Sequence, residues 1–371
     1  MKRLLALALW CLTGCGVDIG PETFSGASVE RSDDALASAL MRGLERFGDE
    51  DGFSGSVGVS RRGTIVFAAG TGLCEVEPRR ECDADTVFPI GSITKPMTAT
   101  AVVALEAEER LAFDDTLVDF LPDIDLSKRN ITIEQLLTHT SGFVDSIGDD
   151  EEAIEWPEFQ RRSAATDLED SPGVAYRYSN VGYSYLGRIV ELVNPDGYEA
   201  YLRTRFFDPA DMDRTGYVLP VWDGVPFAIG YRDHDLERRW GTILDEPWAE
   251  DGPFWNLRGN GGVLSTVNDM LSWQRSLPDD ALPEPSLERM LSPLVDEGGG
   301  DTFYGYGWTV MDTDVGRVAW HDGGNDIFYA VVFWFREADT FFVGLTNASS
   351  NKRTRALLDL ARIAVGLEPD R

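Results

Sequence analysis

Residues 88–95 read Phe-Pro-Ile-Gly-Ser-Ile-Thr-Lys, so that Ser92 stands three positions before Lys95. Two helical positions three apart share one face, with about 5–6 Å between their Cβ atoms, so the Lys95 amine reaches the Ser92 hydroxyl if a helix begins here. The helical composition of residues 97–106 supports that start, and Pro96 is tolerated only in a first turn. Because serine needs a neighbouring base and burial lowers the pKa of a lysine, the pair predicts an activated nucleophile near neutral pH.

A helix cap followed by a lysine that reaches out to solvent explains the same spacing without any chemistry. Lysine is scarce in this chain of 371 residues, and a second Ser-x-x-Lys occurs at Ser349 and Lys352. That copy follows a strand-like run, and no Tyr-x-Asn comes after it. We therefore interpret the second copy as a chance match.

The tripeptide Tyr178-Ser179-Asn180 adds a phenol and an amide to the first copy. A tyrosine beside Lys95 can share protons with it and act as general base. Asn180 can donate to a substrate carbonyl while it contacts Lys95. The alternative is a turn with a buried tyrosine, which is the commoner fate of such a tripeptide.

Residues 321–324 read His-Asp-Gly-Gly and lie between two strand-like runs, at 317–320 and 328–334. Two glycines let the backbone approach a ligand closely. A free N–H there, paired with the N–H of Ser92, would form an oxyanion hole. The alternative is a hairpin turn, because Asp-Gly is a strong hairpin signal.

In this order and spacing, the three motifs resemble those of the serine beta-lactamase and penicillin-binding-protein superfamily, in its class C beta-lactamase, DD-peptidase and esterase branch. That family carries Ser-x-x-Lys, then Tyr-x-Asn, then Lys/His-x-Gly. Further similarity runs from about Ala35 to the C-terminus and includes three segments: 136–142, 259–270 and 304–308.

The resemblance implies a two-step reaction in which Ser92 is acylated and water then releases the acyl group. Lys95 and Tyr178 would share the acid–base work, and Asn180 would place the substrate and Lys95. His321 would line the pocket where many relatives have a lysine. The oxyanion would be held by the backbone N–H groups of Ser92 and Gly324, with Gly323 beside them.

Two departures from the family pattern bear on the substrate. A neutral histidine at position 321 offers a hydrogen bond and a weaker, pH-dependent charge where a lysine offers a permanent cation. Asp322 and Asp326 are expected to put two acids near the pocket mouth, which disfavours anionic substrates. An ester, an amide or a cationic peptide is therefore expected in preference to a penicillin.

The N-terminal residues predict export. A basic start and a short apolar stretch indicate a signal peptide over residues 1–14. Residues 12–15 match a bacterial lipoprotein signal, in which Cys15 carries the lipid, although an ordinary signal peptide with an incidental cysteine remains the alternative. Residues 15–31 would be a tether and residues 32–371 the hydrolase domain, held in the bacterial cell envelope on its periplasmic or extracellular face.

The cysteines and histidines indicate whether a disulfide or a metal site is expected. Cys74 and Cys82 form an even pair in an oxidising compartment, which favours a disulfide between them. The three histidines show no ligand spacing, so neither a metal nor another cofactor is expected. The net charge of −31 repels nucleic acid, and we expect a monomer.

The fold is expected to be α+β, with one antiparallel sheet built from both chain ends and helices on its faces. A capped amphipathic helix should follow Ser32, and a hairpin should span residues 55–69. Strands should return from about residue 305 before a last helix. Between these ends, residues 114–258 should form a mainly helical insert.

Several functions remain open at this stage. A serine hydrolase acting on small esters or amides comes first. A D-Ala-D-Ala carboxypeptidase or D-aminopeptidase acting on peptidoglycan peptides comes second, and a beta-lactamase third. A catalytically silent protein that binds wall peptides is the non-enzymatic alternative, but its signature would be loss of Ser92, Lys95 or Tyr178, and all three are present.

Overall fold

The computed structural model describes residues 17–232, 237–278 and 281–370. In this part of the chain, an eight-stranded sheet is built from strands of both the N-terminal and the C-terminal parts. All neighbouring strands are antiparallel. Its strand order is β2 (Thr64–Thr71), β1 (Gly55–Arg61), β14 (Thr340–Thr346), β13 (Tyr329–Phe335), β12 (Gly316–Gly324), β11 (Thr309–Thr313), β10 (Phe303–Tyr304) and β9 (Val295–Asp296). The predicted fold class is confirmed.

Side chains alternate between the two faces of this sheet, and each face has its own core. In β13, Val331 and Phe333 face the helices α1 (Asp33–Asp51) and α10 (Asn351–Ala364). Ala330 and Val332 face the opposite core, which contains residues of α2 (Thr94–Ala107) and α8 (Val267–Ser276). The sheet is therefore covered on both faces.

The predicted helix after Ser32 is confirmed as α1. The Ser32 hydroxyl accepts from Ala35 N at 3.3 Å, and the helix buries a residue every three to four positions through Phe47. It ends at Gly52, whose φ of +59° suits glycine.

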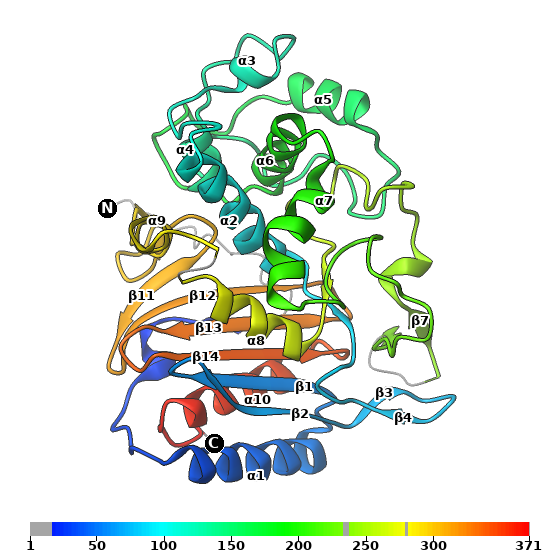
Figure 1. Ribbon diagram of the computed structural model, residues 1–371, viewed down its shortest axis with the longest axis vertical. Helices are drawn as coiled ribbons and strands as arrows, with labels where there is room; N and C mark the ends of the chain where they lie inside the picture. The colour runs from blue at the N-terminus through cyan, green and yellow to red at the C-terminus, as the bar shows by residue number, and fades with distance from the viewer. Residues whose placement is uncertain (1–16, 233–236, 279–280, 371) are drawn as a thin grey trace, which may run out of the picture.

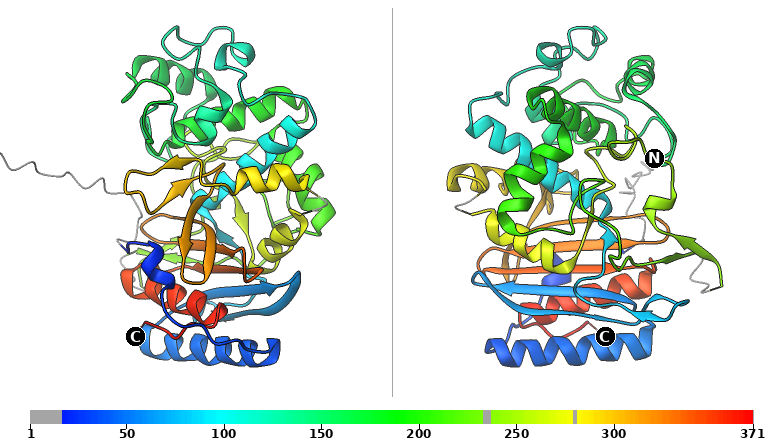
Figure 2. Two further views of the ribbon diagram at one scale, coloured as in Figure 1. Left: turned by 90° about the vertical axis from the view of Figure 1, so that its left-hand side faces the viewer. Right: turned by 45° about the vertical axis from the view of Figure 1, so that its right-hand side comes forward.

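The helical part of the insert stands at the opposite end of the molecule from α1, with the sheet between them (Figures 1 and 2). Its helices are α3 (Leu117–Phe120), α4 (Ile133–Leu137), α5 (Trp156–Ala165), α6 (Asn180–Val193) and α7 (Tyr198–Leu202). The insert also contains a small antiparallel pair of strands, β6 (Gly230–Tyr231) and β7 (Arg239–Gly241). These strands were not predicted from the sequence. Of the described helices, none has the length and apolar character needed to cross a membrane.

The remaining elements connect the sheet to the insert. Strand β3 (Leu73–Glu75) pairs with β4 (Arg80–Glu81), and Cys74 and Cys82 form a disulfide there. Strand β5 (Phe88–Pro89) pairs with β8 (Leu264–Ser265), and this pairing brings the segment before Ser92 beside the segment that follows the insert. Helix α9 (Glu284–Met290) precedes β9.

The predicted tether at residues 15–31 is wrong for its described part. Val17, Ile19 and Phe24 are buried in the same core as α1 and α10. The Phe24 ring lies 5.0 Å from that of Phe333, centroid to centroid. Composition rich in Gly, Ser and Pro suggests a linker, but a few apolar residues are enough to hold the segment on the domain. Residues 1–16, with the predicted signal peptide and Cys15, lie outside the described residues.

Phe24→Ala is expected to lower the free energy of unfolding by about 3 kcal/mol, because it opens a cavity at a fully buried position. Val29→Ala, at a 56% exposed position of the same segment, is the control and should stay within about 0.5 kcal/mol of wild type. Urea unfolding of both variants checks this. Equal stability of Phe24→Ala and wild type would show that the segment detaches in solution.

Candidate active site

Ser92 lies in a single 3-10 turn, η2 (Gly91–Ile93), that leads directly into α2. The α-helix itself begins at Thr94, two residues later than predicted. Gly91 has a φ of +53°, and a Cβ there would lie 2.4 Å from the backbone nitrogen of Gly324. Glycine at 91 therefore allows the serine turn to lie directly against the end of β12.

Lys95 is completely buried, and its Nζ atom is 2.9 Å from the Ser92 Oγ atom. The same nitrogen donates to Asn180 Oδ1 at 2.6 Å and to the carbonyl oxygen of Asn260 at 3.0 Å. Burial lowers the pKa of Lys95 to about 7, although nearby carboxylates act in the opposite direction. The amine therefore changes protonation state near neutral pH.

The partners of Lys95 decide where its lone pair points. Asn180 Nδ2 donates to Asp145 Oδ1 at 2.9 Å, which fixes the amide so that its oxygen faces Lys95. This oxygen and the Asn260 carbonyl can only accept. A neutral Lys95 amine thus directs its two hydrogens to these oxygens and its lone pair to the Ser92 hydroxyl, the geometry of a general base.

Tyr178 also lies beside Lys95, and the Lys95 Nζ atom is 4.7 Å from the centre of the Tyr178 ring. Its hydroxyl is hydrogen-bonded to Ser92, and burial raises the pKa of the phenol well above its usual value. The phenol thus stays protonated near neutral pH. The geometry favours Lys95 as the proton acceptor and Tyr178 as the group that passes a proton on, where the tripeptide alone suggested Tyr178 as base.

Residues 321–324 form the end of strand β12, so the alternative of a hairpin turn at this position is wrong. The turn follows at 325–328, where Asn325 Oδ1 accepts from the backbone N–H groups of Ile327 and Phe328. An asparagine that accepts from the backbone two residues on mimics a backbone turn, and this places the turn after Gly324.

This register leaves the Gly324 N–H free of β13. Asn325 N donates to Phe328 O at 3.0 Å, so the next pair along, Gly324 and Tyr329, is of the non-hydrogen-bonded kind and the Gly324 N–H points outward. Strand β11 pairs with β12 only over 316–320. The end of β12 therefore presents a free edge.

That free edge lies against the serine turn. A Cβ on Gly323 would lie 2.3 Å from the backbone nitrogen of Ser92, so the two backbones are in direct contact. The N–H groups of Ser92 and Gly324 are thus neighbours beside the nucleophile. Such a pair suits an oxyanion hole.

His321 lies beside Tyr178, but both of its ring nitrogens are occupied within the protein. Nδ1 is 2.6 Å from the carbonyl oxygen of Asp322, which can only accept, so this nitrogen carries the hydrogen. Burial and the Lys95 charge lower the pKa of His321 to about 3, so the ring is neutral and Nε2 accepts from the Tyr304 hydroxyl at 3.1 Å. The pH-dependent charge expected at position 321 is absent near neutral pH.

The acids around the site include one of the expected pair, Asp322, which acts on the charge of Lys95. Asp322 is half-buried and hydrogen-bonded to Tyr329, and burial raises its pKa to about 6, while Asp326 is exposed. Asp145 and Asp150, which the motifs did not single out, both act on the charge of Lys95. Desolvation raises the pKa of each, in the case of Asp150 to about 6.

Sequence reasoning thus found the residues that meet at Ser92 but missed some of those that hold them. Three of the missed residues lie in segments that resemble the family: Asn260, His139 and Tyr304. Their place in those segments was the signal that could have pointed to them. Asp145 lies in no motif. In the described part of the chain, no group of three or more metal-ligating side chains occurs.

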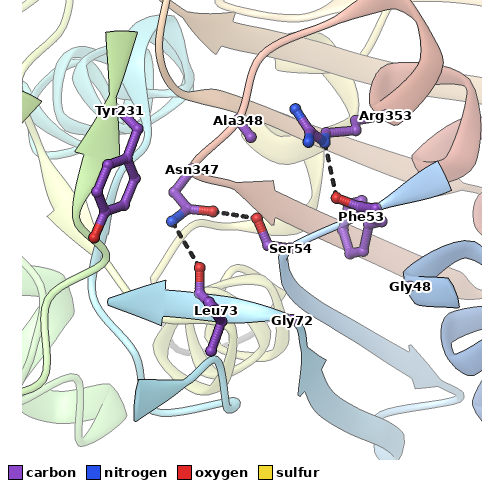
Figure 3. A pocket seen from close by; sticks show the side chains of 10 residues that line it. Gly48, Phe53, Ser54, Gly72, Leu73, Tyr231, Asn347, Ala348 and Arg353 are labelled. Carbon is purple, nitrogen blue, oxygen red and sulfur yellow. Dashed lines mark hydrogen bonds between the residues drawn. The ribbon is translucent and has the colours of Figure 1, made fainter. Parts of the chain in front are cut away.

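A pocket of about 280 Å³ lies away from Ser92, between the start of β1 and the start of α10 (Figure 3). Its Asn347 amide is tied to the protein on both sides, accepting from Ser54 Oγ at 2.6 Å and donating to the Leu73 carbonyl at 3.1 Å. Neither Ser92 nor Lys95 lines this pocket. It is therefore separate from the catalytic group.

The family of the chain follows from comparison with known proteins. The profile described as "Beta-lactamase" matches residues 38–366. The chain belongs to this family, within the superfamily of serine beta-lactamases and penicillin-binding proteins that its motifs indicated.

Two curated relatives show the range of the family. Penicillin-binding protein 4* of Bacillus subtilis is 27% identical over 299 residues, which cover 76% of this chain and 65% of that protein. Esterase EstB of Burkholderia gladioli is 31% identical over 204 residues, which cover 47% of this chain and 52% of the esterase. The chain thus spans less than two thirds of the length of either relative.

Solved structures share the fold at lower identity. The octameric penicillin-binding protein homologue from Pyrococcus abyssi superposes with a TM-score of 0.75 at 24% identity, covering 90% of this chain and 78% of that one. A class C beta-lactamase gives a TM-score of 0.75 at 17% identity, covering 93% and 100%.

Proposed function

We propose that this protein is a serine hydrolase that forms an acyl-enzyme on Ser92 and acts on small esters or amides. The observation that carries the proposal is the position of Lys95. Its amine is buried, has a pKa of about 7, and directs its lone pair to the Ser92 Oγ atom while two acceptor oxygens hold its hydrogens.

In the first step, Ser92 Oγ attacks the acyl carbonyl carbon, and Lys95 takes the hydroxyl proton. The N–H groups of Ser92 and Gly324 stabilise the negative oxygen that develops. The proton then passes through Tyr178 to the leaving oxygen or nitrogen, and the bond from the acyl carbon to that atom breaks. In the second step, water gives its proton to Lys95 and attacks the ester, and the Ser92 oxygen leaves with a proton returned by the same route.

The electrostatics of the site support esters and amides as substrates over carboxylate-bearing ones. His321 is neutral and both of its nitrogens are occupied, so it offers no cation to a substrate carboxylate. Asp145 and Asp150 add negative charge beside Lys95. A named esterase among the relatives supports this reading.

One observation favours a peptidase as the second candidate, either a D-Ala-D-Ala carboxypeptidase or a D-aminopeptidase. The edge of β12 beyond Trp320 is unpaired by β11. An extended peptide can add to such an edge through its main chain. A penicillin-binding protein among the relatives supports this candidate too.

A panel of four substrates tests the proposal on the protein without residues 1–16, with Ser92→Ala beside wild type. The panel contains p-nitrophenyl butyrate, D-alanine p-nitroanilide, a peptide ending in D-Ala-D-Ala, and benzylpenicillin. We expect kcat/KM to be highest on the ester. Turnover confined to the D-alanine compounds would move the assignment to a peptidase, and high turnover of the penicillin would refute the charge argument.

The cell-envelope location is proposed on the sequence alone. A lipid on Cys15 would anchor the protein to a membrane, and replacing Cys15 by serine should release it into the soluble fraction. We propose neither a cofactor nor a nucleic-acid partner.

A further inference from the structure

His139 lies directly behind Tyr178. It follows α4 with a φ of +55°, a left-handed conformation that is uncommon for a residue with a side chain, and it is completely buried. The centroid of its ring lies 4.4 Å from that of Tyr178 and 4.6 Å from that of Tyr304. The imidazole therefore packs against the rings of both tyrosines.

Two hydrogen bonds join His139 to the backbone on either side of Tyr178. Ser179 N donates to His139 Nδ1 at 3.0 Å, and Arg177 N donates to the His139 carbonyl oxygen at 2.7 Å. One residue thus fixes the main chain immediately before and immediately after the phenol.

The hydrogen bond from Ser179 also sets the tautomer. A nitrogen that accepts cannot carry a hydrogen, so Nδ1 is bare and the hydrogen of the neutral ring sits on Nε2. Nε2 has no hydrogen-bond partner among the described residues. What the histidine supplies beyond ring packing is therefore the acceptor at Nδ1 together with its left-handed backbone.

We propose that His139 is a positioning residue for Tyr178, holding the phenol where it can pass a proton to the leaving group. The proposal rests on the proposed function and adds a residue to it. Its consequence is specific: loss of the Nδ1 acceptor should harm reactions that need a proton on the leaving group more than reactions that do not.

Two variants separate the acceptor from simple packing. In His139→Asn, the Oδ1 atom can take the place of Nδ1, and asparagine tolerates the left-handed backbone. In His139→Leu, similar volume is kept but the acceptor is lost, and Ser179 N–H is left buried without a partner. A displacement of about 1 Å at a catalytic group can cost about 100-fold in rate.

The experiment measures kcat/KM for ethyl butyrate and p-nitrophenyl butyrate, because kcat/KM reports acylation alone. In that step ethoxide needs a proton to leave and nitrophenolate does not. We expect His139→Leu to lower kcat/KM by about 30–100-fold on the ethyl ester and by under about 5-fold on the nitrophenyl ester. His139→Asn should recover most of the loss. In a Tyr178→Phe background, the effect of the leucine should disappear.

Three outcomes would each overturn the proposal. The losses could be equal on both esters, or His139→Asn could be as poor as His139→Leu. The effect of His139→Leu could also be undiminished in the Tyr178→Phe background. If His139→Leu does not fold, His139→Gln replaces it, because its longer amide cannot reproduce an acceptor at the Nδ1 position. Failure of the proposed function would appear separately, as hydrolysis that survives Ser92→Ala.

Discussion

Ser92→Ala is expected to reduce kcat on p-nitrophenyl butyrate by at least about 1,000-fold. The substitution removes the atom that would be acylated, while Lys95 and the backbone N–H groups stay in place. Mass spectrometry of the protein mixed with substrate should show an acyl adduct on wild type and none on the variant.

The matched control is Ser349→Ala, in the second Ser-x-x-Lys of the chain. Ser349 lies near the start of α10, and Lys352 of that copy donates to the Glu50 carbonyl at its surface position. The Ser349→Ala variant should keep the kcat of wild type. Loss of activity at Ser349 with retention at Ser92 would reverse the assignment of the nucleophile.

Lys95→Met is expected to cause a loss of similar size, because no other described side chain that can accept a proton near neutral pH is bonded to Ser92. The melting temperature should also fall, because Asn180 Oδ1 and the Asn260 carbonyl both lose a hydrogen-bond donor. The control is Lys352→Met, at a 56% exposed side chain, which should leave kcat within about 2-fold of wild type.

Wild-type kcat/KM should rise with pH, with an apparent pKa of about 7 that belongs to Lys95. Below that pH the amine is protonated and all three of its hydrogens point at oxygens, so it cannot take the Ser92 proton. Above it, the lone pair faces Ser92 Oγ. A flat profile between pH 5 and 9, or one that falls as pH rises, would exclude neutral Lys95 as the base.

Local spacing was enough to predict the features that depend on neighbouring residues. Ser92 and Lys95 are three apart, and the turn that joins η2 to α2 brings their side chains together. The helix after Ser32 follows from a capping serine and an apolar stripe, and both act within a few residues. Short-range geometry of this kind is set by the backbone itself.

Residues whose roles depend on distant partners could not be predicted in the same way. The amide of Asn180 is held by Asp145, 35 positions earlier, which accepts from Nδ2 while Oδ1 faces Lys95. The order of the motifs placed Asn180 in the site, but the contact with Asp145, which helps to orient its amide, comes from the fold. Asp145 itself carries no local signal.

The sequence by itself determined the fold class, the family and the residues that gather at Ser92, because motif order and apolar periodicity are written along the chain. Tertiary structure alone decided the protonation states of His321 and Tyr178, and it supplies the burial that the sequence suggested for Lys95. The lowered pKa of Lys95, the neutral ring of His321 and the protonated phenol of Tyr178 all arise from burial. Burial is the sum of contacts from elements far apart in the chain, and no local pattern encodes the loss of solvent that it brings.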